Sequence, residues 1–229
     1  MRFSLLVLFA TLPRLLGAQT VVPIQEEPRH RLAYDAPALR VLDIRIPPGD
    51  TTLFHRHDAP IAYVFVSPVP TNAQVLGEEW EDAARDTVPL PDVGHVVFNE
   101  VYPTAPREHR VACVGTVPFR LIGILNRGPG QMASRGVPLG TAGPAEAEGR
   151  WFRSAHHTLA SGGPWIMAGH SRPLVVVQVS PGSVAVRPDS GSPRELRGLG
   201  DFVVLEPDVR AQLRNAGAEP VALAIVEVR

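Results

Sequence analysis

The sequence predicts an all-β protein, and three observations support this fold class. The 229-residue chain contains 24 prolines and 20 glycines but only three tryptophans and three tyrosines, a composition typical of short elements joined by tight turns. Residues 42–46 alternate apolar and charged side chains, which is the period of a strand with one face in a core. The best helical candidate is a short charged stretch at residues 78–85, and no segment has an extended helical period.

The predicted strands follow one another through most of the chain. Each is a short apolar run bounded by Gly or Pro, a pattern that favours β architecture over helices. The runs occupy residues 42–46, 61–66, 96–98, 119–125, 174–179, 202–205 and 221–228.

The composition also excludes several kinds of function. The chain has 22 basic residues, all of them arginine, and 23 acidic residues. The resulting net charge of −1 does not favour binding to nucleic acid. Without lysine there is no Schiff-base chemistry. The single cysteine, Cys113, rules out a disulfide within the chain, and we expect it to pack in the core.

The first residues have the features of a secretory signal peptide. Arg2 precedes an apolar run at residues 3–12, which is too short to span a membrane, and the small residue Ala18 follows it. We therefore expect cleavage after Ala18, with an N-terminal arm at residues 19–34. The mature protein is then secreted or periplasmic, with no membrane contact once residues 1–18 are removed.

The rest of the chain contains an internal duplication. Residues 57–68 align without gaps on residues 170–181, and six of the twelve positions are identical. The same order continues in three glycine pairs, namely Gly49 with Gly162, Gly94 with Gly200 and Gly115 with Gly217. A segment rich in Gly and Pro at residues 127–149 has no period and is typical of a linker. We therefore expect two small β domains, at residues 35–126 and 150–229.

The sharpest local signal is the sequence His55-Arg56-His57. Two histidines two positions apart on a strand point to the same face, and inside a small barrel both imidazoles can reach one point. His109 follows about fifty residues later, near the start of another strand. The pattern indicates a metal site. The alternative is a degenerate barrel in which these histidines only form hydrogen bonds.

These motifs resemble those of the cupin superfamily. Residues 49–66 are similar to its first motif, a glycine, five residues, H-x-H and an apolar strand, and residues 94–115 are similar to its second. The resemblance covers nearly all of residues 35–229. It implies a bicupin, with two tandem antiparallel jelly-roll barrels, and it implies His55, His57 and His109 as ligands of one metal ion.

The first half departs from the family pattern at two positions. The glutamate that usually follows the H-x-H falls on Ala62, and the asparagine that follows the third histidine falls on Cys113. Glu100 and Glu108 flank the second motif and are the candidates for a replacement carboxylate, although Glu108 should face away from His109.

The second half departs further. Its H-x-H positions are Ala168 and His170, and the later histidine position falls on Ala211 or Gln212. One imidazole cannot hold a catalytic metal, so we expect the second domain to be a degenerate cupin. We expect His170 to be packed or hydrogen-bonded inside it.

The residues leave two functions open. Three neutral imidazoles suit a divalent transition metal, Fe(II) first and Mn, Ni, Cu or Zn as alternatives. Without a protein carboxylate the ion keeps its +2 charge, which favours a small anionic or chelating substrate, and Arg56, Arg107 or Arg120 could steer such an anion. The first function is a dioxygenase-like metalloenzyme. The alternative is a non-catalytic cupin module that binds a small molecule or a protein partner, and a homodimer is compatible with both.

Overall fold

The structure, a computed structural model, describes residues 20–81, 89–130, 139 and 145–229. The predicted signal peptide lies outside the described residues, as do residues 82–85 of the helical candidate and most of the predicted linker. Residues 78–81 of the helical candidate contain a bend and an isolated bridge but no helix. Among the described residues, no helix is long and apolar enough to cross a membrane.

The all-β prediction is confirmed. One 3-10 turn, η1 (Ile24–Glu26), accompanies eighteen strands in the described residues. The first nine are β1 (Val21–Pro23), β2 (His30–Asp35), β3 (Leu39–Ile46), β4 (Phe54–His57), β5 (Ile61–Ser67), β6 (Thr71–Val75), β7 (Val96–Asn99), β8 (Arg107–Cys113) and β9 (Phe119–Asn126). The others are β10 (Ala147–Glu148), β11 (Phe152–Leu159), β12 (Pro164–Met167), β13 (Leu174–Gln178), β14 (Val184–Pro188), β15 (Arg194–Leu196), β16 (Phe202–Leu205), β17 (Ala211–Asn215) and β18 (Val221–Val228).

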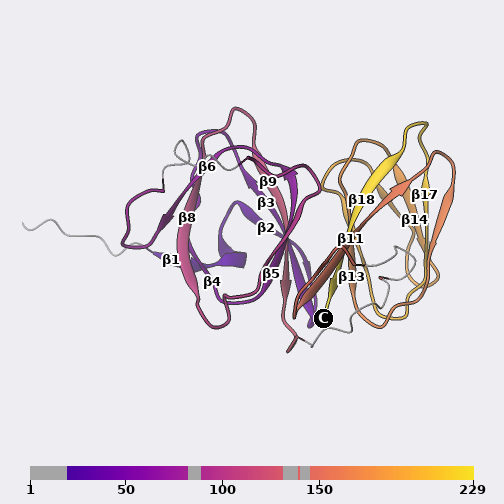
Figure 1. The fold of residues 1–229 in the computed structure, drawn as a ribbon, viewed down its shortest axis with the longest axis horizontal. Helices are drawn as coiled ribbons and strands as arrows, with labels where there is room; N and C mark the ends of the chain where they lie inside the picture. The colour runs from indigo at the N-terminus through magenta and orange to yellow at the C-terminus, as the bar shows by residue number, and fades with distance from the viewer. Residues whose placement is uncertain (1–19, 82–88, 131–138, 140–144) are drawn as a thin grey trace, which may run out of the picture.

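The strands form two lobes that lie side by side, each built from two sheets (Figure 1). In the first lobe a five-stranded sheet, β2-β3-β9-β5-β7, faces a four-stranded sheet, β1-β4-β8-β6. In the second lobe a five-stranded sheet, β10-β11-β18-β13-β16, faces a four-stranded sheet, β12-β17-β14-β15. No described sheet mixes strands of the two lobes, which we call the first and second barrels.

The two barrels repeat the same pairings. Strand β3 pairs with β9 over eight residues, from Leu39 opposite Asn126 to Ile46 opposite Phe119, and β11 pairs with β18 over eight residues in the same way. Two of the three predicted glycine pairs fit this repeat, because Gly49 and Gly162 both have positive φ, as do Gly94 and Gly200. Positive φ is costly for residues with a Cβ atom, so glycine suits both copies of each turn.

Apolar side chains gather in three clusters. One fills the first barrel and includes Leu42, Ile44 and Ile61, and another fills the second barrel. The third lies between the two five-stranded sheets, where Val64 and Ile122 of the first barrel and Val177 and Val226 of the second are fully buried. Both faces of these strands are therefore apolar, which explains their continuous apolar runs.

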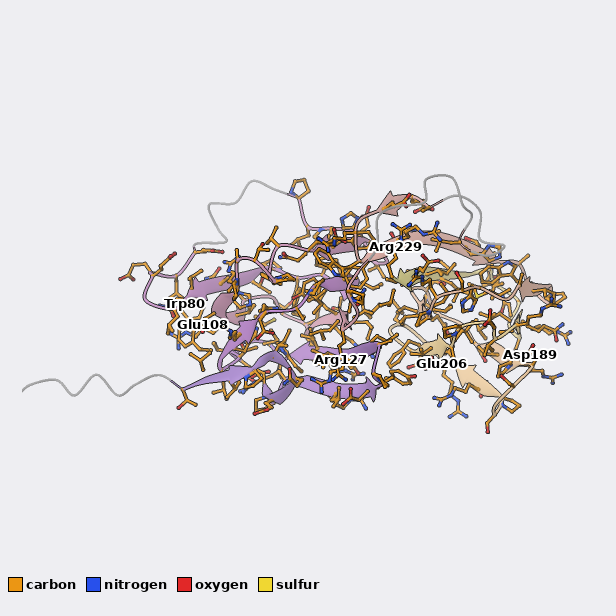
Figure 2. All side chains as sticks on the ribbon, turned by 90° about the horizontal axis from the view of Figure 1, so that it is seen from below. Trp80, Glu108, Arg127, Asp189, Glu206 and Arg229 are labelled. Carbon is orange, nitrogen blue, oxygen red and sulfur yellow. The ribbon has the colours of Figure 1, made fainter. Side chains whose placement is uncertain are left out.

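Polar contacts also join the barrels. Arg120 donates to the carbonyl oxygen of Leu199 at 2.6 Å, and the hydroxyl of Tyr34 contacts the carboxylate of Glu206. The buried side-chain amide of Asn126 donates to the carbonyl oxygen of Arg229 at 2.7 Å. In Figure 2, Arg229 lies near the middle of the molecule, whereas Trp80 and Glu108 lie toward the end of the first barrel that points away from the second.

Candidate metal centre

Three histidines from two adjacent strands meet inside the first barrel. Side chains alternate along β4, so His55 and His57 share the inner face and Arg56 between them is exposed. Strand β8 runs antiparallel to β4 and places His109 directly opposite His55. The three rings have centroids 4.7 to 5.0 Å apart. One ring nitrogen from each histidine lies within 4.8 Å of the other two.

The contacts of the ring nitrogens leave Nε2 free at His55. Its Nδ1 lies 3.0 Å from the carbonyl oxygen of Leu53, so Nδ1–H donates and Nε2 keeps its lone pair. In the same tautomer, Nδ1–H of His57 donates to the hydroxyl oxygen of Tyr63 at 3.4 Å. The buried Nδ1 of His109 has no hydrogen-bond partner among the described residues.

This arrangement fits a transition-metal ion. The Nε2 atoms of His57 and His109 are 3.0 Å apart. Two nitrogens about 2.1 Å from one ion stand roughly 3 Å apart when the angle at the ion is near 90°. Two lone pairs at this distance repel each other unless a proton or a metal ion lies between them, so this donor set is suited to a cation.

Burial keeps the imidazoles neutral, which is the form that binds metal. Burial, helped by the nearby His30, lowers the pKa of His55 to about 4. Burial and the neighbouring His55 lower the pKa of His109 to about 3. Burial and His109 hold the pKa of His57 far below its usual value. At neutral pH all three rings therefore offer lone pairs without first losing a proton.

The expected position of the missing glutamate needs a correction. Counting from the H-x-H places it at Ala62, but Ala62 packs in the cluster between the barrels, facing away from the histidines. Its neighbours Ile61 and Tyr63 face into the first barrel instead. No carboxylate joins the three histidines within the described part of the chain.

Neither candidate for a replacement carboxylate reaches the centre. Glu108 accepts a hydrogen bond from Arg56 at 3.0 Å on the outer face of the sheet, as its place on the strand predicts. Glu100 accepts from the backbone N–H groups of Arg150 and Trp151 at 3.0 and 2.9 Å, where the second barrel begins.

The remaining candidate residues lie elsewhere. Cys113 is buried at the end of β8, and its thiol lies 3.6 Å from the carbonyl oxygen of Val117. His170 is buried in the second barrel, where its Nδ1 contacts the carbonyl oxygen of Arg172. No second group of three metal-binding side chains occurs in the residues that the structure describes.

Several side chains around the centre are not predicted by the sequence patterns. His30 is 4% exposed, and its ring centroid lies 4.6 Å from that of His55. Tyr102 packs against His57 with ring centroids 4.7 Å apart. Tyr63 is half-buried on β5, and its hydroxyl contacts His57. A short sequence motif could not reveal these residues, because they lie on separate strands and loops that are far apart in the sequence.

Arg107 is a charged residue beside the centre. It lies opposite His57 in the ladder of β4 and β8 and precedes His109 by two residues, so it shares the inner face. Its charge lowers the pKa of both His57 and His109 further. One guanidinium nitrogen donates to Glu81 at 2.9 Å, whereas the buried Nε has no partner among the described residues.

The fold thus consists of two antiparallel barrels, the first with three convergent imidazoles. No protein-family model and no curated protein sequence matches the chain. Solved structures do match it. AerE from Microcystis aeruginosa is 10% identical with a TM-score of 0.57, and the match covers 89% of this chain and 98% of that one.

Two further solved structures place the fold among the cupins. Salicylate 1,2-dioxygenase from Pseudaminobacter salicylatoxidans is 11% identical with a TM-score of 0.56, and the match covers 85% of this chain and 72% of that one. A cupin 2 conserved barrel domain protein from Leptotrichia buccalis is 10% identical with a TM-score of 0.50, over 85% and 86% of the two chains. At these identities the likeness establishes the fold, which is that of the cupin superfamily.

Proposed function

We propose that the chain is a metal-dependent cupin enzyme of the dioxygenase kind, with one ion held by His55, His57 and His109. The observation that carries this proposal is the convergence of three neutral imidazoles, of buried His55 and His57 and half-buried His109, on one point inside the first barrel. Fe(II) is the metal we expect, because an all-nitrogen set of three ligands with open positions suits it. The bound ion would supply Lewis acidity and a place for substrate oxygens.

The substrate we propose is a small anion that can chelate. Three neutral ligands leave the +2 charge of the ion uncompensated, so a negative oxygen from the substrate is favoured there. Arg107 adds a second positive charge on the same face, with a buried Nε–H that needs an acceptor. Among the similar structures, one of salicylate 1,2-dioxygenase is an adduct with gentisate. We assign Arg107 to hold the anionic group of the substrate.

The side chains around the histidines would shield this chemistry from water. Tyr102 covers His57, and burial raises the pKa of both Tyr63 and Tyr102, so both hydroxyls stay protonated at neutral pH. A protonated hydroxyl near His57 can donate a hydrogen bond to a substrate oxygen and cannot compete as an anionic ligand. The second barrel is a scaffold in this proposal, because it presents one buried histidine where the first has three.

Export is a further part of the proposal and rests on residues 1–18 alone. The domain limits at residues 35–126 and 150–229 belong to it as well. The sheets support the division into two halves, but β1 and β2 join the first barrel from before residue 35, and β10 joins the second barrel from before residue 150.

The alternative is a non-catalytic cupin module that binds a small molecule. The observation that favours it is the depth of the centre, since His55 and His57 are only 1% and 3% exposed and no described carboxylate joins them. A buried, carboxylate-free centre suits tight binding at least as well as turnover.

One experiment separates these functions. The full chain, with its own first 18 residues, is expressed and purified without a metal-affinity step, and its metal content is measured by mass spectrometry. Oxygen uptake is then followed with gentisate, cysteine and acetylacetone as representatives of diols, thiols and diketones. We expect about one transition metal per chain and oxygen uptake with one of these classes. Bound metal without oxygen uptake favours the binding module, and protein without metal overturns both the metal site and the enzyme.

A further inference from the structure

The N-terminal arm places two buried polar side chains close to the metal centre. The proposed function does not use either of them. Strand β1 pairs in parallel with β4, which places Val22 beside His55. The chain then turns through η1 into β2, and this turn buries Glu27 and His30, which are 1% and 4% exposed. A buried carboxylate and a buried imidazole are costly unless they form specific contacts, so their partners indicate their role.

The carboxylate of Glu27 is connected to His55 through one residue. Its Oε1 accepts a hydrogen bond from the backbone N–H of Leu53 at 3.1 Å, and the carbonyl oxygen of Leu53 accepts from Nδ1–H of His55 at 3.0 Å. Glu27 therefore holds the backbone residue that selects the tautomer of His55. In this tautomer Nε2 of His55 keeps its lone pair and can bind a metal ion.

The other oxygen of Glu27 is held just as firmly. Oε2 accepts from the backbone N–H of Arg29 at 2.5 Å, and the guanidinium of Arg29 lies 3.5 Å from Oε1. Arg29 also donates to Asp50 at 2.7 and 3.0 Å, in the loop that leads into β4. The arm and the start of the H-x-H strand are thus joined by charged hydrogen bonds at two points, which restricts movement of β4 relative to the arm.

His30 restrains the ring of His55 directly. The two rings meet edge to face, with an interplanar angle of 78°. Nδ1–H of His30 donates to the carbonyl oxygen of Ile24 at 3.0 Å, so this ring is itself held in one orientation. A rotation of the His55 ring would have to displace a neighbour that is tied to the backbone.

We propose that Glu27 and His30 are positioning residues of the metal centre, so that the N-terminal arm is a working part of the site. Glu27 acts through Leu53 on the tautomer of His55, and His30 holds the plane of its ring. A role of Glu27 and His30 in catalysis rests on the proposed function, whereas their effect on the tautomer and ring orientation of His55 does not.

The test compares Glu27→Gln with Glu26→Gln, a matched control that removes the same charge from an exposed neighbour. Glutamine can accept from only one of the two backbone N–H groups, so its amide must oppose the other. In the metal-free proteins, long-range proton–nitrogen NMR reports the tautomer of His55. In a Co²⁺ titration, the visible absorption reports affinity and coordination. We expect Glu27→Gln to lose the single Nδ1–H tautomer and to bind Co²⁺ about 10-fold more weakly, with Glu26→Gln unchanged.

The outcomes distinguish this inference from the proposed function. A folded Glu27→Gln protein with the parental His55 tautomer and the parental Co²⁺ affinity overturns the inference. If the parent binds no Co²⁺, the proposed function fails, and the tautomer comparison alone still decides whether Glu27 positions His55. Should Glu27→Gln not fold, His30→Phe takes its place. It keeps an edge-to-face ring but loses the bond to Ile24, and we expect a mixture of His55 ring states and weaker Co²⁺ binding. Unchanged spectra in that variant would also refute the inference.

Discussion

His55 lies directly opposite His109 in the ladder of β4 and β8. The corresponding pair in the second barrel is Met167 opposite Ala211 on β12 and β17. Ala211 corresponds to His109 because each precedes its glycine, Gly217 or Gly115, by six residues. The residue opposite Ala211 is Met167, one position before Ala168, which the ungapped alignment pairs with His55. Met167 and Ala211 both belong to the apolar cluster that fills the second barrel. The same backbone arrangement thus carries a polar centre in one barrel and a dry core in the other.

This asymmetry predicts that only first-barrel histidines affect metal binding. His57→Ala removes one of three ligands, and we expect metal content to fall from about one per chain to near zero, because two imidazoles bind far more weakly than three. His170→Ala is the control, since His170 is also buried but has no described metal-binding neighbours. Mass spectrometry of both purified variants checks the prediction. Equal metal in His57→Ala and the parent would remove the site.

Arg107 should control affinity for anions and leave neutral ligands unaffected. Losing a hydrogen bond to a charged group costs about 1.5 to 3 kcal/mol, so Arg107→Gln should weaken gentisate binding by about 10- to 100-fold in the metal-loaded protein. Arg56→Gln is the matched control, because Arg56 lies on the neighbouring strand but points outward to Glu108. Calorimetric titration with gentisate and with an uncharged amide analogue measures both effects. Equal losses in the two variants would indicate general charge attraction and no specific contact.

Acid should destabilise the metal-free protein between pH 6.5 and about 4. Burial lowers the pKa of His30 and of His55 from 6.5 to about 4. Within this window the unfolded chain binds more protons than the folded one, so the free energy of unfolding decreases as the pH falls. Each of these histidines contributes up to about 1.4 kcal/mol per pH unit. Urea midpoints at pH 7, 6 and 5 measure the slope.

The control for this pH dependence is His95→Gln, which removes an exposed histidine and should leave the slope as it is. His30→Phe should flatten it. A midpoint that stays constant from pH 7 to pH 5 would show that the buried histidines gain protons without penalty, contrary to their burial.

The cluster between the barrels should be a main source of stability. Phe152 is fully buried there and packs against Phe98 of the first barrel with ring centroids 5.5 Å apart. We expect Phe152→Ala to lower the free energy of unfolding by about 3–5 kcal/mol, because it leaves a cavity between two sheets. Val101→Ala, at a position 60% exposed, should change it by less than about 0.5 kcal/mol. Chemical unfolding followed by circular dichroism compares the two, and similar midpoints would mean that the barrels are stable without this contact.

The sequence by itself determined the fold class, the duplication and the core of the site. Strand spacing is a local property, so the two-residue separation of His55 and His57 was enough to place both on one face. The continuous apolar run of β5 similarly predicted a strand. Among strands with mixed polar sequences, β8 was anticipated only around His109, and β11 was not predicted as a strand. Their inner faces carry arginine or histidine, so the usual alternation of apolar and polar side chains is absent.

Only the tertiary structure decided which face of a strand points toward the histidines and which residues surround the histidines. Along β5 both faces are apolar, because one lines the first barrel and the other packs on the second. The sequence pattern therefore could not tell that Ala62 points away from the centre while Tyr63 points into it. Glu27 and His30 reach His55 because β1 pairs in parallel with β4, a contact between segments about thirty residues apart. Such pairings depend on the packing of the whole barrel, and no local period in the sequence encodes them.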